Sequence, residues 1–192
     1  MRNHNEKLRK ISFKSGFTVL ETIVAFAIIS LAIGGVFGAV RTGLVGSIIS
    51  KDETRGYFLA QEAIEVLRQK RDGNKLTSIN TGVVVNWLSG ISENSGTDPC
   101  RAGAICRLDP QSLTLTYCGA SWGSCPDMLQ DATSYLYNHT SGNATRYKRE
   151  IQVECTGACS SATEAQVTIR VAWTKGVNNY ELKVKTLMVN WR

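Results

Sequence analysis

Hydrophobic and polar residues are distributed unevenly along this chain of 192 residues. Residues 22–40 contain no charged side chain and form one continuous, mostly apolar stretch. As a helix, these nineteen residues would extend about 28 Å, close to the thickness of the hydrocarbon core of a bilayer. The pattern therefore predicts a membrane-spanning helix near the start of the chain.

The helical pattern continues past this stretch and becomes amphipathic from residue 52. Apolar residues recur at helical spacing and predict one buried face. Asp72, Gly73 and Asn74 follow as a turn signal that should end the helix. We expect a hydrophobic helix over residues 17–50 and an amphipathic helix over residues 51–72. The predicted buried face consists of Tyr57, Leu59, Ala60, Ala63, Ile64, Val66 and Leu67.

Residues 73–192 show the alternation that is typical of β-strands, separated by loops. The strand signals cover residues 112–118, 146–154, 165–174 and 180–189, whereas residues 83–88 fit a short strand or a helical turn. Short links between the last three strands predict an antiparallel sheet, whose apolar face needs a cover. The amphipathic helix is the expected cover. The predicted fold class is therefore α+β, a long N-terminal helix packed on a C-terminal antiparallel sheet.

Six cysteines all lie downstream of the apolar stretch, in a polar region that looks secreted. An even number in such a region favours disulfides, with free thiols or a metal site as the alternatives. Neither a C-x-x-C pair nor zinc-type spacing is present. Six cysteines allow fifteen connectivities, and local pairing is the favoured one. It would join Cys100 to Cys106, Cys118 to Cys125, and Cys155 to Cys159.

Charge is concentrated at the N-terminus. The first sixteen residues carry five basic residues and one acidic residue, so they supply four of the six net positive charges. Basic residues before an apolar helix place the N-terminus in the cytoplasm and the cysteine-rich part outside. The rest of the chain has too little positive charge to indicate a nucleic-acid partner.

A secretory signal peptide also begins with a basic segment and an apolar one. Here the apolar stretch is longer than a typical signal core, and no small-x-small cleavage site precedes a polar start. The helix is therefore expected to remain in the mature protein, in contact with membrane lipid.

Glu21 is the unusual residue, because a carboxylate at the edge of an apolar stretch is costly unless it is paired or faces water. Gly16 followed by Phe17-Thr18-Val19-Leu20-Glu21 resembles the processing motif of type IV prepilins. That family includes type IV pilins, minor pilins and the pseudopilins of type II secretion. The resemblance implies a leader over residues 1–16 that prepilin peptidase removes, and N-methylation of Phe17.

The resemblance also implies a role for Glu21 in assembly. Once the leader is cut, the amine of Phe17 is a cation, and Glu21 of a neighbouring subunit would neutralise it in an apolar filament core. The expected partners are prepilin peptidase, other pilin subunits and the inner-membrane assembly machinery. The chain would reside in the cytoplasmic membrane before assembly and in a cell-surface filament afterwards.

Other segments bear on the specific system. The LAQEAIE sequence and the C-terminal Asn190-Trp191 resemble a subgroup of minor-pilin-like proteins, and the cysteine loops also favour a minor subunit. Five glycines in the first helix suit close helix packing or local unwinding, and the sequence leaves both open. They are Gly34, Gly35, Gly38, Gly43 and Gly46.

No catalytic motif, metal-ligand pattern or cofactor-binding loop is recognisable, so no enzyme activity, metal or cofactor is predicted. A pseudopilin of type II secretion or of DNA uptake is the alternative within the same superfamily. A single-span, membrane-anchored binding domain is the alternative of another class. A simple anchor would gain nothing from Gly16, Phe17 and Glu21.

Overall fold

The computed structural model describes residues 16–94 and 96–191. Apart from Gly16, the predicted leader lies outside these residues. The chain is α+β: one long N-terminal helix that begins in an apolar stretch, antiparallel sheets and three disulfides. It divides into two units, Met1–Ile49 and Ser50–Arg192, and each is described by itself. We call the second the globular unit.

Helix α1 covers Val19–Thr81 and belongs to both units. It does not end at residues 72–74, so that prediction was wrong. The returning chain supports the extra turns, because the Asn74 side-chain amide donates hydrogen bonds to the carbonyls of Trp87 and Ser89. Gly82, at φ 70°, takes the left-handed conformation typical of a helix end, and its N–H bonds to the Ser78 carbonyl.

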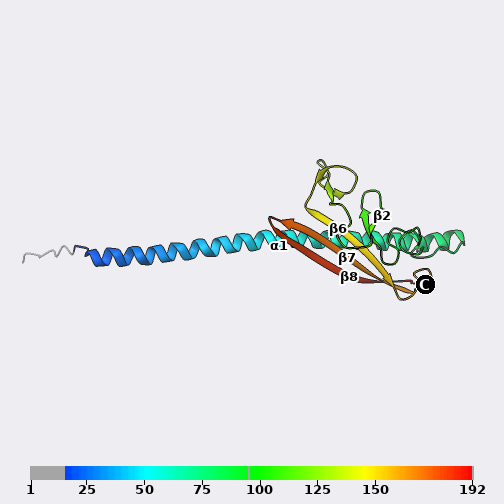
Figure 1. Ribbon diagram of the computed structural model, residues 1–192, viewed down its shortest axis with the longest axis horizontal. Helices are drawn as coiled ribbons and strands as arrows, with labels where there is room; N and C mark the ends of the chain where they lie inside the picture. The colour runs from blue at the N-terminus through cyan, green and yellow to red at the C-terminus, as the bar shows by residue number, and fades with distance from the viewer. Residues whose placement is uncertain (1–15, 95, 192) are drawn as a thin grey trace, which may run out of the picture. The chain divides into compact units, whose positions relative to one another are not determined.

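The main sheet has five antiparallel strands in the order β2-β1-β6-β7-β8. Figure 1 shows β6, β7 and β8 running side by side. Strands β6 to β8 match the predicted ones within a few residues, whereas β1 was missed and residues 83–88 form no strand. The strands are β1 (Ile105–Asp109), β2 (Thr114–Gly119), β6 (Tyr147–Cys155), β7 (Glu164–Lys175) and β8 (Asn178–Val189).

A second, three-stranded antiparallel sheet had no counterpart in the sequence predictions. Its order is β4-β3-β5, with β3 (Leu129–Gln130), β4 (Tyr137–Asn138) and β5 (Asn143–Ala144). Each strand has only two residues, too few for an alternation to be visible. We call residues 128–145 the lobe; it projects from the main sheet in Figure 1.

Alternate residues of the main sheet and one face of α1 share a single core cluster. In β7 the inward residues are Val167, Ile169, Val171 and Trp173, all buried. From α1 the cluster takes Leu59, Ala60, Ala63, Ile64 and Leu67, with Val66 partly buried against it. Tyr57, predicted on this face, is 48% exposed. Gly56 is buried instead, and a methyl group there would come within 3.2 Å of the Trp173 ring.

Candidate functional sites

The predicted processing motif lies where regular structure begins. Gly16, Phe17 and Thr18 precede the helix and have no regular secondary structure. The hydroxyl of Thr18 accepts a hydrogen bond from the backbone N–H of Glu21 at 3.2 Å. Thr18 is therefore the N-cap of α1, and Glu21 occupies the third helical position, as in a capping box. Part of the motif thus has a local purpose, which is to start the helix.

The helix that follows is uncovered in the single chain. Every residue from Gly16 to Ile48 is exposed. An 18-residue window within α1 has a mean hydropathy of 2.5 and no buried residue, so the helix is long and apolar enough to cross a membrane. Exposed apolar surface on this scale marks a membrane or protein contact, because water is an unfavourable neighbour for it.

In the globular unit, the first buried residue of α1 is a charged one. Asp52 is 1% exposed, and its carboxylate accepts hydrogen bonds from the guanidinium of Arg146 and the hydroxyl of Tyr147. The ammonium of Lys175 lies 3.7 Å from the second carboxylate oxygen. A buried carboxylate needs such partners. Asp52 therefore joins α1 to the start of β6 and to the end of β7.

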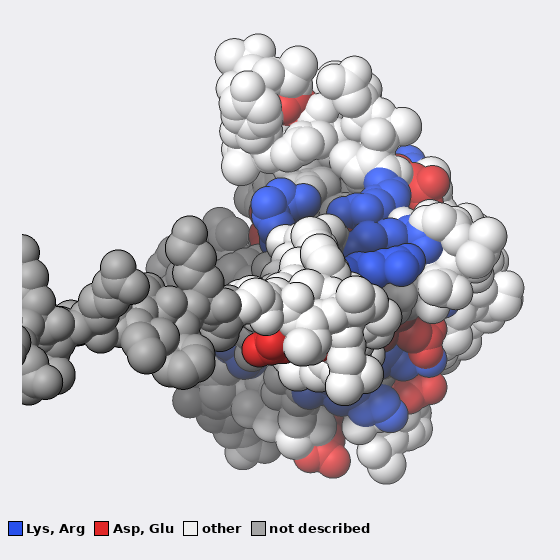
Figure 2. Space-filling model, turned by 90° about the vertical axis from the view of Figure 1, so that its left-hand side faces the viewer, with Lys and Arg blue, Asp and Glu red and all other residues white. Residues whose placement is uncertain are grey.

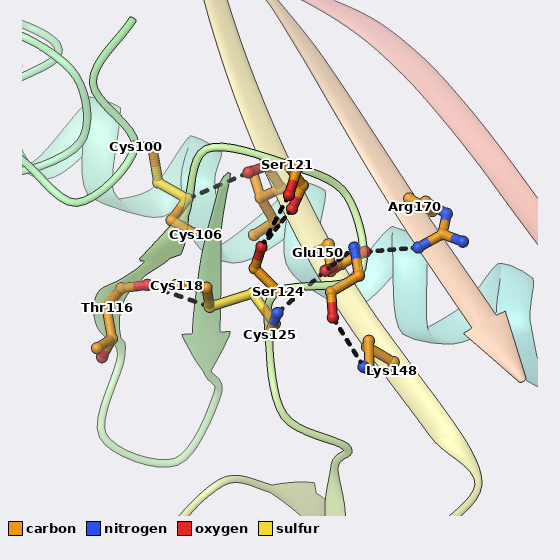
Figure 3. Close-up of a disulfide and its surroundings, with 12 residues drawn as sticks. Cys100, Cys106, Thr116, Cys118, Ser121, Ser124, Cys125, Lys148, Glu150 and Arg170 are labelled. Carbon is orange, nitrogen blue, oxygen red and sulfur yellow. Dashed lines mark hydrogen bonds and ion pairs between the residues drawn. A yellow bond between two sulfur atoms is a disulfide. The ribbon is translucent and has the colours of Figure 1, made fainter. Parts of the chain in front are cut away.

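A second buried carboxylate lies on the outer face of the main sheet, the face that points away from α1 and the core cluster. Glu150 on β6 is fully buried and forms an ion pair with Arg170 on β7 at 2.7 Å. Its other oxygen accepts hydrogen bonds from the backbone N–H groups of Gly123 and Cys125. Figure 3 shows Glu150 between Arg170 and the loop that the Cys118–Cys125 disulfide closes. Glu150 thus holds this loop over the outer face.

A groove of about 500 Å³ opens beside this loop, and both faces of the sheet contribute to its lining. Its polar residues include Arg146, Lys148 and Arg170 opposite Asp127 and Glu181. Basic side chains gather on this side of the molecule, below the lobe, in Figure 2. Ala172 pairs with Lys148 on one side and with Glu181 on the other in the strand register. Its side chain is small and therefore leaves space at the bottom of the groove.

The charges in the groove are largely paired already. Arg170 bonds to Glu150 and to Glu181, each at 2.7 Å. The ammonium of Lys148 donates to the Gly123 carbonyl and lies 3.9 Å from Asp127. The groove can therefore hold a small polar ligand, but its balance of charge gives no strong preference for an anion. Within the described residues, no cluster of His, Cys, Asp or Glu is arranged to hold a metal ion.

Another polar cluster ties the lobe to the main sheet. Burial raises the pKa of Asp109, but hydrogen bonds from the His139 and Ser112 backbones and from the Thr140 hydroxyl outweigh it, so the net shift is downward. Burial and the positive charges of Arg107 and Arg149 lower the pKa of His139 to about 4. His139 is therefore neutral at pH 7.

The structure assembles the sequence-predicted residues as follows. The six cysteines form the three local disulfides, Cys100–Cys106, Cys118–Cys125 and Cys155–Cys159. Phe17 and Glu21 lie together at the start of α1, on either side of its N-cap. Sequence reasoning missed Asp52 and Glu150, because an isolated acidic residue gives no sign in the sequence that it points inward.

Comparison with protein-family models, with curated proteins and with solved structures finds no match for this chain.

Proposed function

We propose that this chain is a structural subunit, of the minor-pilin kind, of a type IV pilus-like filament. The supporting observation is the uninterrupted exposure of the apolar part of α1 directly behind the prepilin-like motif. Lipid would cover this apolar surface while the subunit is in the membrane, and other subunits would cover it in the filament. Neither an enzymatic role nor a cofactor enters the proposal.

The backbone at the expected cut suits processing. A peptidase needs an accessible, non-helical strand, and Gly16 and Phe17 are exposed and precede the first residue of α1. Cleavage between them would leave the helix and its Thr18 cap intact. Prepilin peptidase is therefore the proposed first partner, and Phe17 is the proposed methylated N-terminus.

The electrostatics of the helix start favour a carboxylate at position 21. The amine that cleavage creates at Phe17 would lie beside the positive end of the helix dipole, which disfavours a cation there. Glu21, in the first turn, offsets both charges. Glu21 of an adjacent subunit would do the same in the apolar interior of a filament, where low dielectric strengthens the pairing. This contact would set the register between subunits.

We place the subunit first in the cytoplasmic membrane, N-terminus inside, with the globular unit and its disulfides outside. The inner-membrane assembly machinery would then move it into a surface filament. A pseudopilin of type II secretion or DNA uptake shares all these features. A membrane-anchored binding domain that never polymerises is the second candidate, and the groove beside the Cys118–Cys125 loop favours it.

Two measurements on one tagged strain test the proposal. Intact mass spectrometry of the membrane-purified chain should give a mature protein that begins at Phe17 and carries one methyl group. Shearing the cells should release the tagged chain with filaments. A Gly16→Leu variant, which places a bulky residue at the cut, should stay full-length and remain in the membrane. A wild-type protein that still begins at Met1, or a cleaved chain that never leaves the membrane, would contradict the proposed function.

A further inference from the structure

Two hairpin turns of the globular unit are built in the same way. Asp109 begins the β1–β2 turn, and its carboxylate accepts hydrogen bonds from the N–H groups of Gln111 and Ser112 at 2.9 and 3.3 Å. Asp131 begins the β3–β4 turn and accepts from Thr133 and Ser134 at 2.9 and 2.7 Å. The sequences correspond, Asp-Pro-Gln-Ser-Leu and Asp-Ala-Thr-Ser-Tyr.

The fifth residue of each turn has an unfavourable backbone conformation. Leu113 has φ 54° and Tyr135 has φ 59°, and in the described part of the chain no other residue except glycine has a positive φ. Hairpins of this kind commonly place glycine there, because any Cβ is crowded in the left-handed region. Large apolar side chains therefore occupy the two positions that least suit them.

Neither side chain is part of the hydrophobic core. Leu113 is 42% exposed and Tyr135 is 71% exposed, and the neighbouring Leu136 is 55% exposed. None of the three belongs to the core cluster. Exposed apolar side chains at positions where the turn favours glycine point to a contact outside the chain.

The surroundings of the two turns define the chemistry of that contact. Between Arg107 and Arg146 the chain contains no lysine or arginine. Asp109 and Asp131 are occupied by the hydrogen bonds of their own turns. Exposed hydroxyl and amide groups dominate the lobe, whose surface is almost uncharged in Figure 2. The two turns therefore have no basic side chain of their own with which to bind an anionic polymer or lipid.

The apolar area is also small. A fully buried aromatic side chain covers about 150–250 Å², so the tips of the two turns, Leu113 and Tyr135, offer on the order of 200 Å² of apolar surface. A stable protein interface needs roughly 800 Å² from each partner. Aromatic and aliphatic side chains beside hydroxyl and amide groups suit a ligand that is uncharged, rich in hydroxyls and apolar on its ring faces. We propose that Tyr135 and Leu113 are contact points for an uncharged polysaccharide.

The test uses the full chain in detergent micelles, retained on cellulose, chitin or cross-linked dextran, with carboxymethyl dextran as the charged counterpart. We expect retention on a neutral polymer that persists at high salt. Tyr135→Gly and Leu113→Gly should each reduce retention at least tenfold and leave the melting temperature unchanged or higher, because glycine relieves the strain. Tyr135→Phe, which keeps the ring, should retain binding. Val177→Ser, which removes a more exposed apolar side chain from the turn between β7 and β8, is the control.

Several results would overturn the proposal: no retention on any neutral polymer, retention only on the charged one, or full retention by both glycine variants. A lower melting temperature in both glycine variants would show that the side chains support the fold. Self-association that the glycine variants abolish would assign the tips to a second copy of the chain. All of these results are independent of filament assembly.

Discussion

Arg149 on β6 and Glu62 on α1 form an ion pair of 2.6 Å in which the arginine side chain is completely buried and the glutamate remains 38% exposed. The same guanidinium donates to the backbone carbonyls of Leu59 and Leu108, at 3.0 and 2.9 Å. One side chain therefore connects the helix, β6 and β1. Its burial lowers the pKa of Arg149, and the charge of Glu62 opposes that shift.

Removing this arginine should be costly. Arg149→Met leaves the Leu59 and Leu108 carbonyls without their donor. We expect the free energy of unfolding to fall by about 2–4 kcal/mol. Glu62→Gln keeps an acceptor oxygen but leaves the buried guanidinium without its counter-charge, so we expect a smaller loss of about 1–3 kcal/mol. Urea unfolding of both variants, followed by tryptophan fluorescence, measures the difference. Equal effects would mean that the ion pair, and not the carbonyl contacts, carries the stabilisation.

The helix face can be tested with a matched pair of substitutions. Ile64 is 8% exposed and Tyr57 is 48% exposed. Ile64→Asp would bury a charge without a partner and should lower stability by at least about 3 kcal/mol. Tyr57→Asp should change it by less than about 1 kcal/mol. Thermal unfolding of the two variants measures the difference in stability. Similar losses of stability in both variants would show that α1 presents a different face to the sheet.

Glu21→Gln isolates the assembly charge. The amide keeps the shape and is cheaper to bury, so membrane insertion should be maintained. Cleavage after Gly16 should continue, whereas entry into filaments should fall because the Phe17 amine loses its ionic partner. Membrane level, leader removal and the sheared fraction are measured in one strain. Wild-type incorporation by a cleaved Gln variant would remove the pairing from the mechanism.

All six cysteines should be oxidised in protein that has reached the outside of the cell. Alkylation without reduction, followed by mass spectrometry, should label none of them, and alkylation after reduction should label six. Labelling of two or more before reduction would contradict three bridges. Bound zinc in the unreduced protein would replace the disulfide interpretation with a metal site.

Acidification should weaken the fold through His139. Its pKa in the folded state, about 4, is below the ordinary value of 6.5. The unfolded chain therefore takes up a proton first, and stability falls as the pH drops from about 6.5 to 4. Between pH 7 and 5 we expect a loss of at most about 2 kcal/mol. His139→Gln should flatten this dependence, and an unchanged pH profile in that variant would mean that another group is responsible.

The sequence predicted elements with a long, regular pattern and failed where a few distant contacts decide. Strands β6, β7 and β8 alternate over nine to twelve residues and were recognised. By contrast, the predicted end of α1 was too early, because Asp72, Gly73 and Asn74 resemble a helix-termination signal. In the structure, Asn74 bonds to residues 13 and 15 positions further on, and the pattern of the helix alone cannot indicate this.

The sites divide in the same way. Gly16, Phe17, Glu21 and the local cysteine pairs are short-range patterns, and the sequence displays them directly. The groove depends on Lys148, Ala172 and Glu181, which become neighbours only through the register of three strands. The strained turns were equally hidden, because a left-handed leucine or tyrosine contradicts the preference that sequence interpretation relies on.

The three disulfides have a kinetic consequence. Each joins cysteines only four to seven positions apart. Short loops lose little entropy on closing, so such pairs meet more often than distant ones in an unfolded chain. A chain that emerges gradually into an oxidising compartment can complete each bridge before the next cysteine pair appears. The correct pairing among fifteen alternatives then follows from the order of emergence, with no reshuffling step once the sheet has formed.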